Sequence, residues 1–327
     1  MGAAMPLAEK KLIARVRRQV KPAAGIVAGI GDDCAIVRVP RGHELLITTD
    51  LSLEGIHFRR DWHPPEAAGH RCLTRGLSDI AAMGGNPIAV FLSMALPKNL
   101  PQAWVDGFIR GFLKLARRYR VALAGGDTAE SPGGILADVI VVGSAPRGLA
   151  IRRSSAKPGD RIYVTGVLGG SAAALLHLRS NRQARLRPSV YPQHFYPEPR
   201  LAVGRRLRES TLASSMIDLS DGLSTDLAHI CEESGVGAVL LETAIPRASI
   251  GKPAREVDLP SALHGGEDYE LLFTASPQKR IPTRIAGVPI TQVGQITGRG
   301  PILLMNQRGV NSELIPHGWE HFHEERK

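Results

Sequence analysis

The hydrophobic positions of this 327-residue chain switch repeatedly between helical spacing and the short apolar runs of strands. In the first half, helical spacing predicts helices at residues 7–20, 64–83 and 102–120. Apolar runs predict strands at residues 34–39, 44–49, 88–96 and 135–144, with a short strand entering Gly125-Gly-Asp127. Strands that alternate with helices predict an α/β unit whose ligand-binding side chains lie on the loops at the strand ends.

The second half repeats this alternation. Strands are predicted at residues 161–165, 238–241, 269–275 and 291–296, and helices from Gly169-Gly170, over 198–209, and from Ser220-Asp-Gly222 to Cys231. Residues 179–199 are rich in Arg, Gln and Pro, which is typical of an exposed loop. Because the length suits about two domains, we place an N-terminal domain at residues 1–147 and a C-terminal α/β domain at residues 148–327.

Composition adds a basic charge to this picture. The formal net charge is +10, and 43% of the residues are hydrophobic, enough for sizeable cores. The basic residues recur at spacings typical of solvated helix faces, and no zinc-finger spacing or aromatic RNA-binding signature accompanies them. We therefore interpret the charge as a surface that attracts anionic metabolites, and we expect no nucleic-acid partner.

The chain also gives no sign of a membrane or an oxidising compartment. Its longest apolar run, residues 89–96, has the length of a strand, whereas a bilayer span needs roughly 18 residues. The first residues contain no apolar segment typical of a leader peptide. Three cysteines without a CxxC pair suit a reducing compartment. We expect a cytoplasmic protein with no membrane partner.

Aspartates stand at the ends of several apolar runs, each beside Gly, Ser or Thr. They include Asp33, Asp50, Asp79, Asp127, Asp218 and Asp221. A carboxylate where a strand opens into a turn faces a site, because the strand sets its direction and small neighbours let a ligand approach the backbone. Several such groups in one cleft repel one another unless cations lie between them, and ligand sets made only of oxygen favour Mg²⁺. The pattern therefore predicts a metal-dependent phosphate enzyme.

These aspartates lie within longer motifs that follow one another along nearly the whole chain. The motifs are Gly29-Ile-Gly-Asp-Asp-Cys-Ala35, Thr49-Asp-Leu-Ser-Leu-Glu-Gly-Ile-His-Phe58, Leu77-Ser-Asp-Ile-Ala-Ala-Met-Gly84, Gly125-Gly-Asp-Thr128, Arg153-Ser-Ser-Ala-Lys-Pro-Gly-Asp160, Ile217-Asp-Leu-Ser-Asp-Gly222 and Gly265-Gly-Glu-Asp-Tyr-Glu-Leu-Leu-Phe273. Together they resemble the thiamine-monophosphate kinase family of the aminoimidazole-ribotide-synthetase-like superfamily. The resemblance implies that the chain phosphorylates thiamine monophosphate to thiamine diphosphate with ATP and Mg²⁺. It also implies a two-domain fold of that superfamily, whose N-terminal domain forms a β-barrel across a homodimer.

The resemblance assigns roles to individual residues. The implied Mg²⁺ ligands are Asp33, Thr48, Thr49, Asp50, Asp79, Asp127, Asp218 and Asp221. Gly126, Asp127, Arg153 and Ser220 are implied to contact the nucleotide. His57, Glu267 and Trp319 are implied to contact thiamine monophosphate.

The reaction needs few other groups. The chain has no Gly-x-x-x-x-Gly-Lys-Ser/Thr loop, so metal ions take the place of a P-loop in holding the phosphates. Transfer of a phosphoryl group depends mostly on positioning and charge neutralisation. An acceptor that is a phosphate monoester, with a second pKa of about 6, is largely a dianion at neutral pH. We therefore expect no catalytic general base.

Some residues favour a structural interpretation, and other functions stay open. Asp32, Asp160 and Asp226 are typical of turns or N-caps, and Cys34 is interpreted as a packed small residue. One rival is another ATP-dependent enzyme of the superfamily, such as aminoimidazole ribotide synthetase. The hydrogenase-maturation dehydratase is expected to end in a cysteine, whereas this chain ends with residues 324–327, Glu-Glu-Arg-Lys. A non-enzymatic basic protein that binds RNA is the remaining alternative.

Overall fold

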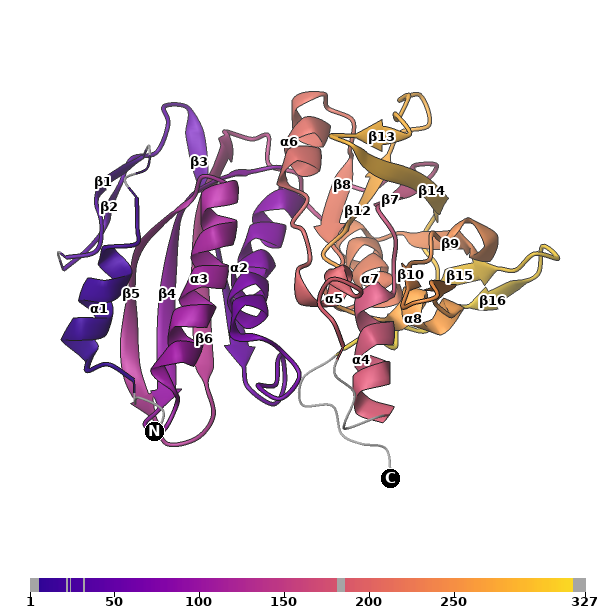
Figure 1. The fold of residues 1–327 in the computed structure, drawn as a ribbon. Coiled ribbons are helices and arrows are strands. Elements are labelled where there is room, and N and C mark those ends of the chain that lie inside the picture. Colours follow the sequence, from indigo (N-terminus) through magenta and orange to yellow (C-terminus); the bar gives the residue numbers. More distant parts are fainter. Residues whose placement is uncertain (1–5, 22, 24, 32, 181–185, 320–327) are drawn as a thin grey trace. The chain divides into compact units, whose positions relative to one another are not determined.

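The structure is a computed structural model that describes residues 6–21, 23, 25–31, 33–180 and 186–319. The expectations for Asp32 and for residues 324–327 lie outside the described residues. Contacts divide the described chain into two compact units (Figure 1). The first unit falls within Met1–Ile80 and Gly85–Leu149, and the second within Ala81–Gly84 and Ala150–Lys327.

The first unit is built on a four-stranded sheet in the order β3-β6-β4-β5. Its strands are β3 (His43–Leu53), β4 (Asn86–Pro97), β5 (Ala122–Ser131) and β6 (Leu136–Pro146). β4 pairs in parallel with β5, and β6 pairs antiparallel with both β3 and β4. Within the described residues of this unit the sheet ends at edge strands β3 and β5, so it is open rather than a closed barrel.

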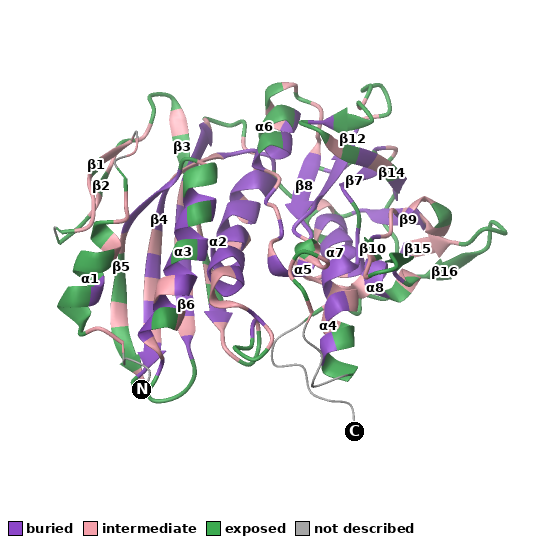
Figure 2. Ribbon diagram, viewed as in Figure 1, coloured by how far each residue is buried: buried purple, intermediate pink, exposed green. Residues whose placement is uncertain are grey.

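Helices cover one face of this sheet. They are α2 (Pro65–Ala82) and α3 (Gln102–Arg118), and both cross in front of the strands in Figure 1. Along β3 the burial alternates: Leu46 and Ser52 are buried, whereas Leu45, Ile47 and Leu51 are exposed (Figure 2). Because strand side chains point alternately to opposite faces, one face packs against the helices and the other carries exposed apolar side chains.

Smaller elements flank the β5 edge. They are α1 (Glu9–Arg17) and the antiparallel pair β1 (Ile26–Ala28) and β2 (Ile36–Val37). Arg15 binds Asp106 of α3 with two side-chain hydrogen bonds, both 2.7 Å long. The three helices predicted for this half are confirmed, with ends shifted by a few residues.

The second unit contains a larger mixed sheet in the order β16-β15-β9-β14-β7-β12-β8, with β13 paired to β14. Its strands are β7 (Arg161–Thr165), β8 (Ser215–Asp218), β9 (Gly237–Leu241), β12 (Leu271–Ala275), β13 (Arg284–Ile285), β14 (Val288–Thr297), β15 (Ile302–Met305) and β16 (Asn311–Glu313). All pairings are antiparallel except that of β15 with β9.

Helices and a short hairpin complete this unit. They are α4 (Gly170–Ser180), α5 (Pro192–Phe195), α6 (Leu201–Glu209), α7 (Leu223–Ser234), α8 (Leu259–His264), the 3₁₀ turn η1 (Glu242–Ala244), and the pair β10 (Ser249–Ile250) and β11 (Arg255–Glu256). The core joins apolar residues of the sheet to α7, including Ile162, Leu227 and Leu272. None of the helices in the described ranges has both the length and the hydrophobicity needed to cross a membrane.

One expectation for this unit is wrong. The described part of residues 179–199 is not simply an exposed loop, because His194 and Phe195 of α5 are buried. His194 Nδ1 lies 3.0 Å from the hydroxyl of buried Ser171 on α4. The Pro-rich composition hid this docking because a four-residue helix has too little periodicity to detect.

The contact between α2 and α3 depends on glycine. A methyl group on Gly69 would overlap the carbonyl oxygen of Phe108, and one on Gly111 would overlap that of Glu66. The two helices therefore approach more closely than any side chain at these positions would allow. This approach sets the position of α2 against β3.

We predict that Gly111→Ala lowers the free energy of unfolding by about 1–3 kcal/mol, since it forces the two helix backbones apart. Gly133→Ala is the matched control, because a methyl group there meets no atom within 4 Å. Urea unfolding of both variants measures the difference. Equal stability of the two would contradict this account of the helix contact.

Candidate active site

The structure places most first-unit candidates inside regular elements. Thr48, Thr49 and Asp50 lie within β3, Asp127 lies within β5, and Asp79 lies on α2. The expectation that these ligands occupy loops at strand ends is therefore wrong. The physical reason is that the β3–β6 pairing continues without interruption to Leu53, well past the last predicted residue.

Thr48 and Asp50 face α2, where they meet a compact acidic cluster. The Thr48 hydroxyl donates a hydrogen bond to Asp79 Oδ2, and Arg75 Nε lies 3.7 Å from Asp50 Oδ1. Asp50 Oδ2 is buried and has no hydrogen-bond partner among the described residues. The pKa of Asp50 is raised to about 7, chiefly by burial and then by Asp79, while Arg75 opposes the rise. The cluster thus places the carboxyl groups of Asp50 and Asp79 close together, with Arg75 beside Asp50.

A second set of polar groups lies on the exposed face of the sheet. The Thr49 hydroxyl donates to Asp138 Oδ1 at 2.8 Å. Asp138 on β6 stands opposite Ser93 on β4, which in turn stands opposite Asp127 on β5. Directly paired residues share a face, so Thr49, Asp138 and Asp127 line one side of the sheet.

Asp138 and Arg75 were missed in the sequence. Asp138 has a signal, because it is a carboxylate inside an otherwise apolar strand run, where the charge requires a partner. Arg75 has no comparable signal, since an arginine on an amphipathic helix is ordinary. Only the crossing of α2 over β3 brings Arg75 to Asp50.

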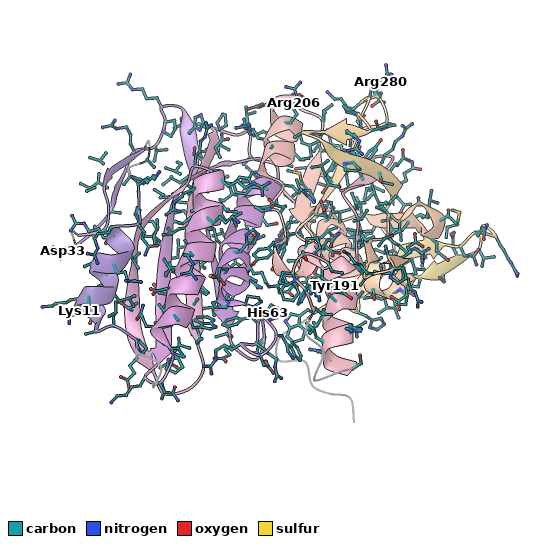
Figure 3. The ribbon with its side chains drawn as sticks, in the orientation of Figure 1. Lys11, Asp33, His63, Tyr191, Arg206 and Arg280 are labelled. Carbon is teal, nitrogen blue, oxygen red and sulfur yellow. The ribbon has the colours of Figure 1, made fainter. Side chains whose placement is uncertain are left out.

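A cavity of about 610 Å³ brings Asp33 and Asp127 to one site in the first unit. Its walls come from α1, residues 29–31 and 33–35, β4, α3 and β5. Figure 3 labels Asp33, which lies beside α1. Cys34 also lines the cavity and is exposed, so the expectation that it is a packed residue is wrong. A volume of this size is typical of small-molecule sites.

The Gly-Gly pair on β5 lines this cavity and packs closely against β4. Gly126 has a φ of +148°, and a methyl group there would overlap the carbonyl oxygen of Leu92. Asp127 Oδ1 accepts a hydrogen bond of 2.7 Å from the Thr128 N–H. Bare backbone beside a carboxylate suits the close approach of a phosphate with its metal ion.

His57 follows the end of β3 and is half-buried. Its Nδ1 accepts the Leu53 N–H at 3.0 Å. A neutral ring in this arrangement carries its proton on Nε2, which makes Nε2 a hydrogen-bond donor.

The second unit has an acidic cluster of its own. Asp218 ends β8 and is buried, and Asp221 lies in the loop before α7. Asp226, on the first turn of α7, accepts the N–H groups of Asp221 and Gly222 at 3.1 and 3.0 Å. Burial raises the pKa of Asp226 well above its usual value, and Asp218 and Asp221 raise it further. Asp226 lies within α7 and not at the predicted turn or N-cap, but its carboxyl does organise the helix start.

His229 completes this arrangement. One ligand atom each of Asp221, Asp226 and His229 lie within 4.8 Å of one another. His229 was missed in the sequence because a lone histidine on a helix carries no signal until the helix start is placed. Asp160 also has the predicted turn role, since its Oδ2 accepts the Lys157 N–H at 3.1 Å.

Main-chain hydrogen bonds gather three other candidates around the 218–222 loop. The Glu267 N–H donates to the Ser220 carbonyl at 2.8 Å, and the Trp319 N–H donates to the Asp221 carbonyl at 3.2 Å. The Trp319 side chain is 49% exposed. Ser220, Glu267 and Trp319 therefore meet at one end of α7.

Arg153 is not part of this group. Its carbonyl accepts a hydrogen bond of 2.8 Å from the hydroxyl of Ser234, the last residue of α7. A helix of 12 residues is about 18 Å long, so the main chain of Arg153 lies far from Ser220. The Arg153 side chain is exposed.

Comparison with known proteins gives consistent matches along the chain. Residues 31–145 match the AIR synthase related protein, N-terminal domain, and residues 157–302 match the AIR synthase related protein, C-terminal domain. The thiamine-monophosphate kinase of Salmonella typhimurium is 38% identical, covering 97% of this chain and 99% of that protein. The thiamine-monophosphate kinase of Bacillus subtilis is 32% identical, covering 91% and 94% respectively.

Solved structures agree. The crystal structure of thiamine-monophosphate kinase from Stenotrophomonas maltophilia K279a is 33% identical with a TM-score of 0.78, covering 95% of this chain and all of that one. A structure described as AaThiL complexed with AMPPCP and TMP is 28% identical with a TM-score of 0.76, covering 96% of each chain. Hydrogenase maturation protein HypE in complex with ATP, at 18% identity, shares the fold alone.

The two α/β units and their matches define an AIR synthase related fold with an N-terminal and a C-terminal domain. Sequence identity of 38% over nearly the whole chain identifies a narrower family than the fold alone does. The chain belongs to the thiamine-monophosphate kinase family.

We predict that Asp50→Asn stabilises the metal-free protein. The folded pKa of about 7 lies above the ordinary 3.8, so ionised Asp50 destabilises the fold increasingly as pH rises from about 4 to 7. The gain in unfolding free energy is therefore larger at pH 8 than at pH 5, on the order of 1–4 kcal/mol at most.

Urea unfolding in a chelator at both pH values measures this gain. Asp61→Asn is the control, because Asp61 is exposed and Arg59 holds its pKa below the usual value. A variant less stable than wild type at pH 8 would show that the Asp50 charge is already neutralised in the fold.

Proposed function

We propose that this protein transfers the γ-phosphoryl group of ATP directly to the phosphate of thiamine monophosphate, giving thiamine diphosphate. The observation that carries the proposal is the near-full-length similarity to proteins named thiamine-monophosphate kinase. The similarity in fold to AaThiL complexed with AMPPCP and TMP supports a nucleotide and TMP as the two ligands.

Mg²⁺ fits the acidic clusters. Asp50 Oδ2 is a buried oxygen with no hydrogen-bond partner within the described ranges, and Asp79 and Asp138 add negative charge beside it. The carboxylates and hydroxyls of this cluster offer oxygen atoms, which are the ligands that Mg²⁺ prefers. The residues that would hold Mg²⁺ are Asp33, Thr48, Thr49, Asp50, Asp79 and Asp127 in the first unit, and Asp218 and Asp221 in the second. Bound there, the ions would neutralise the charge that develops on the phosphates during transfer.

The nucleotide is assigned to Gly126, Asp127, Arg153 and Ser220. The cavity lined by Gly126 and Asp127 supports this assignment, because glycine lets a phosphate approach the backbone closely. Arg153 would act through its long side chain, since its main chain lies by the far end of α7.

The acceptor is assigned to His57, Glu267 and Trp319. His57 Nε2 offers a donor to a phosphate oxygen, and the half-exposed indole of Trp319 offers a face to the cationic thiazolium ring. The acceptor phosphate is largely a dianion at neutral pH. The protein therefore needs to orient an oxygen of the acceptor phosphate in line with the γ-phosphorus of ATP. It does not need to remove a proton from that oxygen.

We propose a homodimer formed through the first unit. Leu45, Ile47 and Leu51 are between 46% and 67% exposed on one face of the sheet, and a patch of this kind marks an interaction surface. We assign ATP and Mg²⁺ binding and the dimer contact to residues 1–147, where two copies of the open sheet would close a barrel. Residues 148–327 form the C-terminal α/β domain. The free cysteines suit a cytoplasmic location.

The direct test is a coupled assay of ADP release with ATP, Mg²⁺ and thiamine monophosphate. We predict turnover of the monophosphate and little with free thiamine, because a hydroxyl acceptor needs a general base. The Asp50→Asn variant, although more stable, is expected to lose phosphoryl transfer. Comparable rates on thiamine, or turnover only with an aminoimidazole-ribotide precursor, would contradict the proposal.

We predict that Trp319→Ala raises the KM for thiamine monophosphate by about 2- to 30-fold. A cation–π contact is worth about 0.5–2 kcal/mol, and each 1.4 kcal/mol is a factor of about ten. The KM for ATP is expected to change little. Ile315→Ala, another exposed apolar residue of the same segment, is the control. An equal rise in both KM values would show that Trp319 only holds the segment in place.

A further inference from the structure

The 265–270 segment, which carries Glu267, has a strained backbone. Glu267 has a φ of +64° and Tyr269 a φ of +52°, both in the left-handed region that side chains with a Cβ rarely adopt. Two such residues flanking Asp268 require support from the surrounding structure.

One side of the segment is held by the 218–222 loop. The Glu267 N–H donates to the Ser220 carbonyl, and the Tyr269 N–H donates to the Leu219 carbonyl at 2.9 Å. Gly266 lies so close that a methyl group there would come within 2.5 Å of the Ser220 carbonyl oxygen. These hydrogen bonds fasten the segment to the 218–222 loop on one side only.

Acidic side chains hold the other side. Asp268 Oδ2 accepts the Gly169 N–H at 2.7 Å, immediately before α4. Glu270 accepts hydrogen bonds from Thr165 and, through both carboxyl oxygens, from Arg200. Asp268 and Glu270 thus tie the segment to the turn between β7 and α4 on either side of Tyr269.

Glu270 has a cationic partner in Arg200, whereas Asp268 accepts its hydrogen bond from the Gly169 main chain. Burial raises the pKa of Asp268 to about 8, with Glu270 and Glu267 adding to the rise and the Gly169 and Ser171 backbone opposing it. Asp268 Oδ2 can accept the Gly169 N–H whether or not Oδ1 carries a proton.

We propose that Asp268 is a positioning residue for the acceptor side of the site. By accepting the Gly169 N–H, it holds the 265–270 segment in the strained conformation from which Glu267 reaches thiamine monophosphate. The inference rests on the proposed function, and it adds a residue that acts through Glu267 rather than by touching the substrate.

Asp268→Ala and Asp268→Asn test this role in the full-length protein. Alanine removes the acceptor, so the KM for thiamine monophosphate is expected to rise about tenfold while the KM for ATP stays within about twofold. Asparagine keeps an acceptor oxygen of the same length and is expected to restore constants close to wild type. In a Glu267→Gln background, Asp268→Ala is expected to add less than about twofold, because coupled residues are not additive.

Asn306→Ala is the matched control. Asn306 Oδ1 also accepts main-chain N–H groups in a turn, from Arg308 and Val310, and no effect on either KM is expected. Thermal melting checks that each variant folds. If Asp268→Ala does not fold, Asp268→Asn decides: wild-type constants support the role, and a tenfold loss overturns it.

The other results separate this inference from the proposed function. Equal rises in both KM values, or full additivity with Glu267→Gln, would overturn the positioning role alone. An unchanged KM in a folded Asp268→Ala variant would do the same. A wild-type protein that does not phosphorylate thiamine monophosphate would overturn the proposed function and this inference together.

Discussion

The close packing of buried carboxylates is the constraint on which the candidate site depends. In the first unit, Asp79 and Asp138 both raise the pKa of buried Asp50, and Arg75 is a cation beside it. In the second, Asp218, Asp221 and Asp226 repeat the situation. Burial raises the cost of each charge, because a buried carboxylate is stable only when it is paired, protonated or bound to a cation. Ionising these carboxyl groups therefore lowers the stability of the folded protein, and a bound cation would reduce this loss.

Rigid packing is what keeps the carboxylates in this arrangement. Gly69 and Gly111 let α2 and α3 approach at backbone distance, and α2 in turn holds Asp79 against Thr48 of β3. Without that packing, repulsion would simply move the helix away from the strand. The charge that the proposed metal-binding role requires of Asp50 is thus one that destabilises the metal-free fold.

In the second unit, the candidate site includes a segment of strained backbone. Its 265–270 segment keeps two non-glycine residues at positive φ and is fastened on both sides, by main-chain bonds to the 218–222 loop and by Asp268 and Glu270 to the β7–α4 turn. The same loop accepts the Trp319 N–H. Ser220, a nucleotide candidate, and the acceptor candidates Glu267 and Trp319 are therefore connected by main-chain hydrogen bonds to one short loop.

The sequence by itself determined the α/β class, most long helices and strands, and the identity of the acidic motifs. Periodicity over ten or more residues is a local property, and the order of motifs carried the family resemblance. It did not determine that Thr48 and Asp50 lie in mid-strand facing α2, that α5 docks by His194, or that Arg75, Asp138, His229 and Asp268 join the candidate sites. Each of these depends on which segments pair or cross, and such contacts between residues far apart in sequence leave no local pattern. Tertiary structure alone decided which charges face one another, and so which of them a cation would have to neutralise.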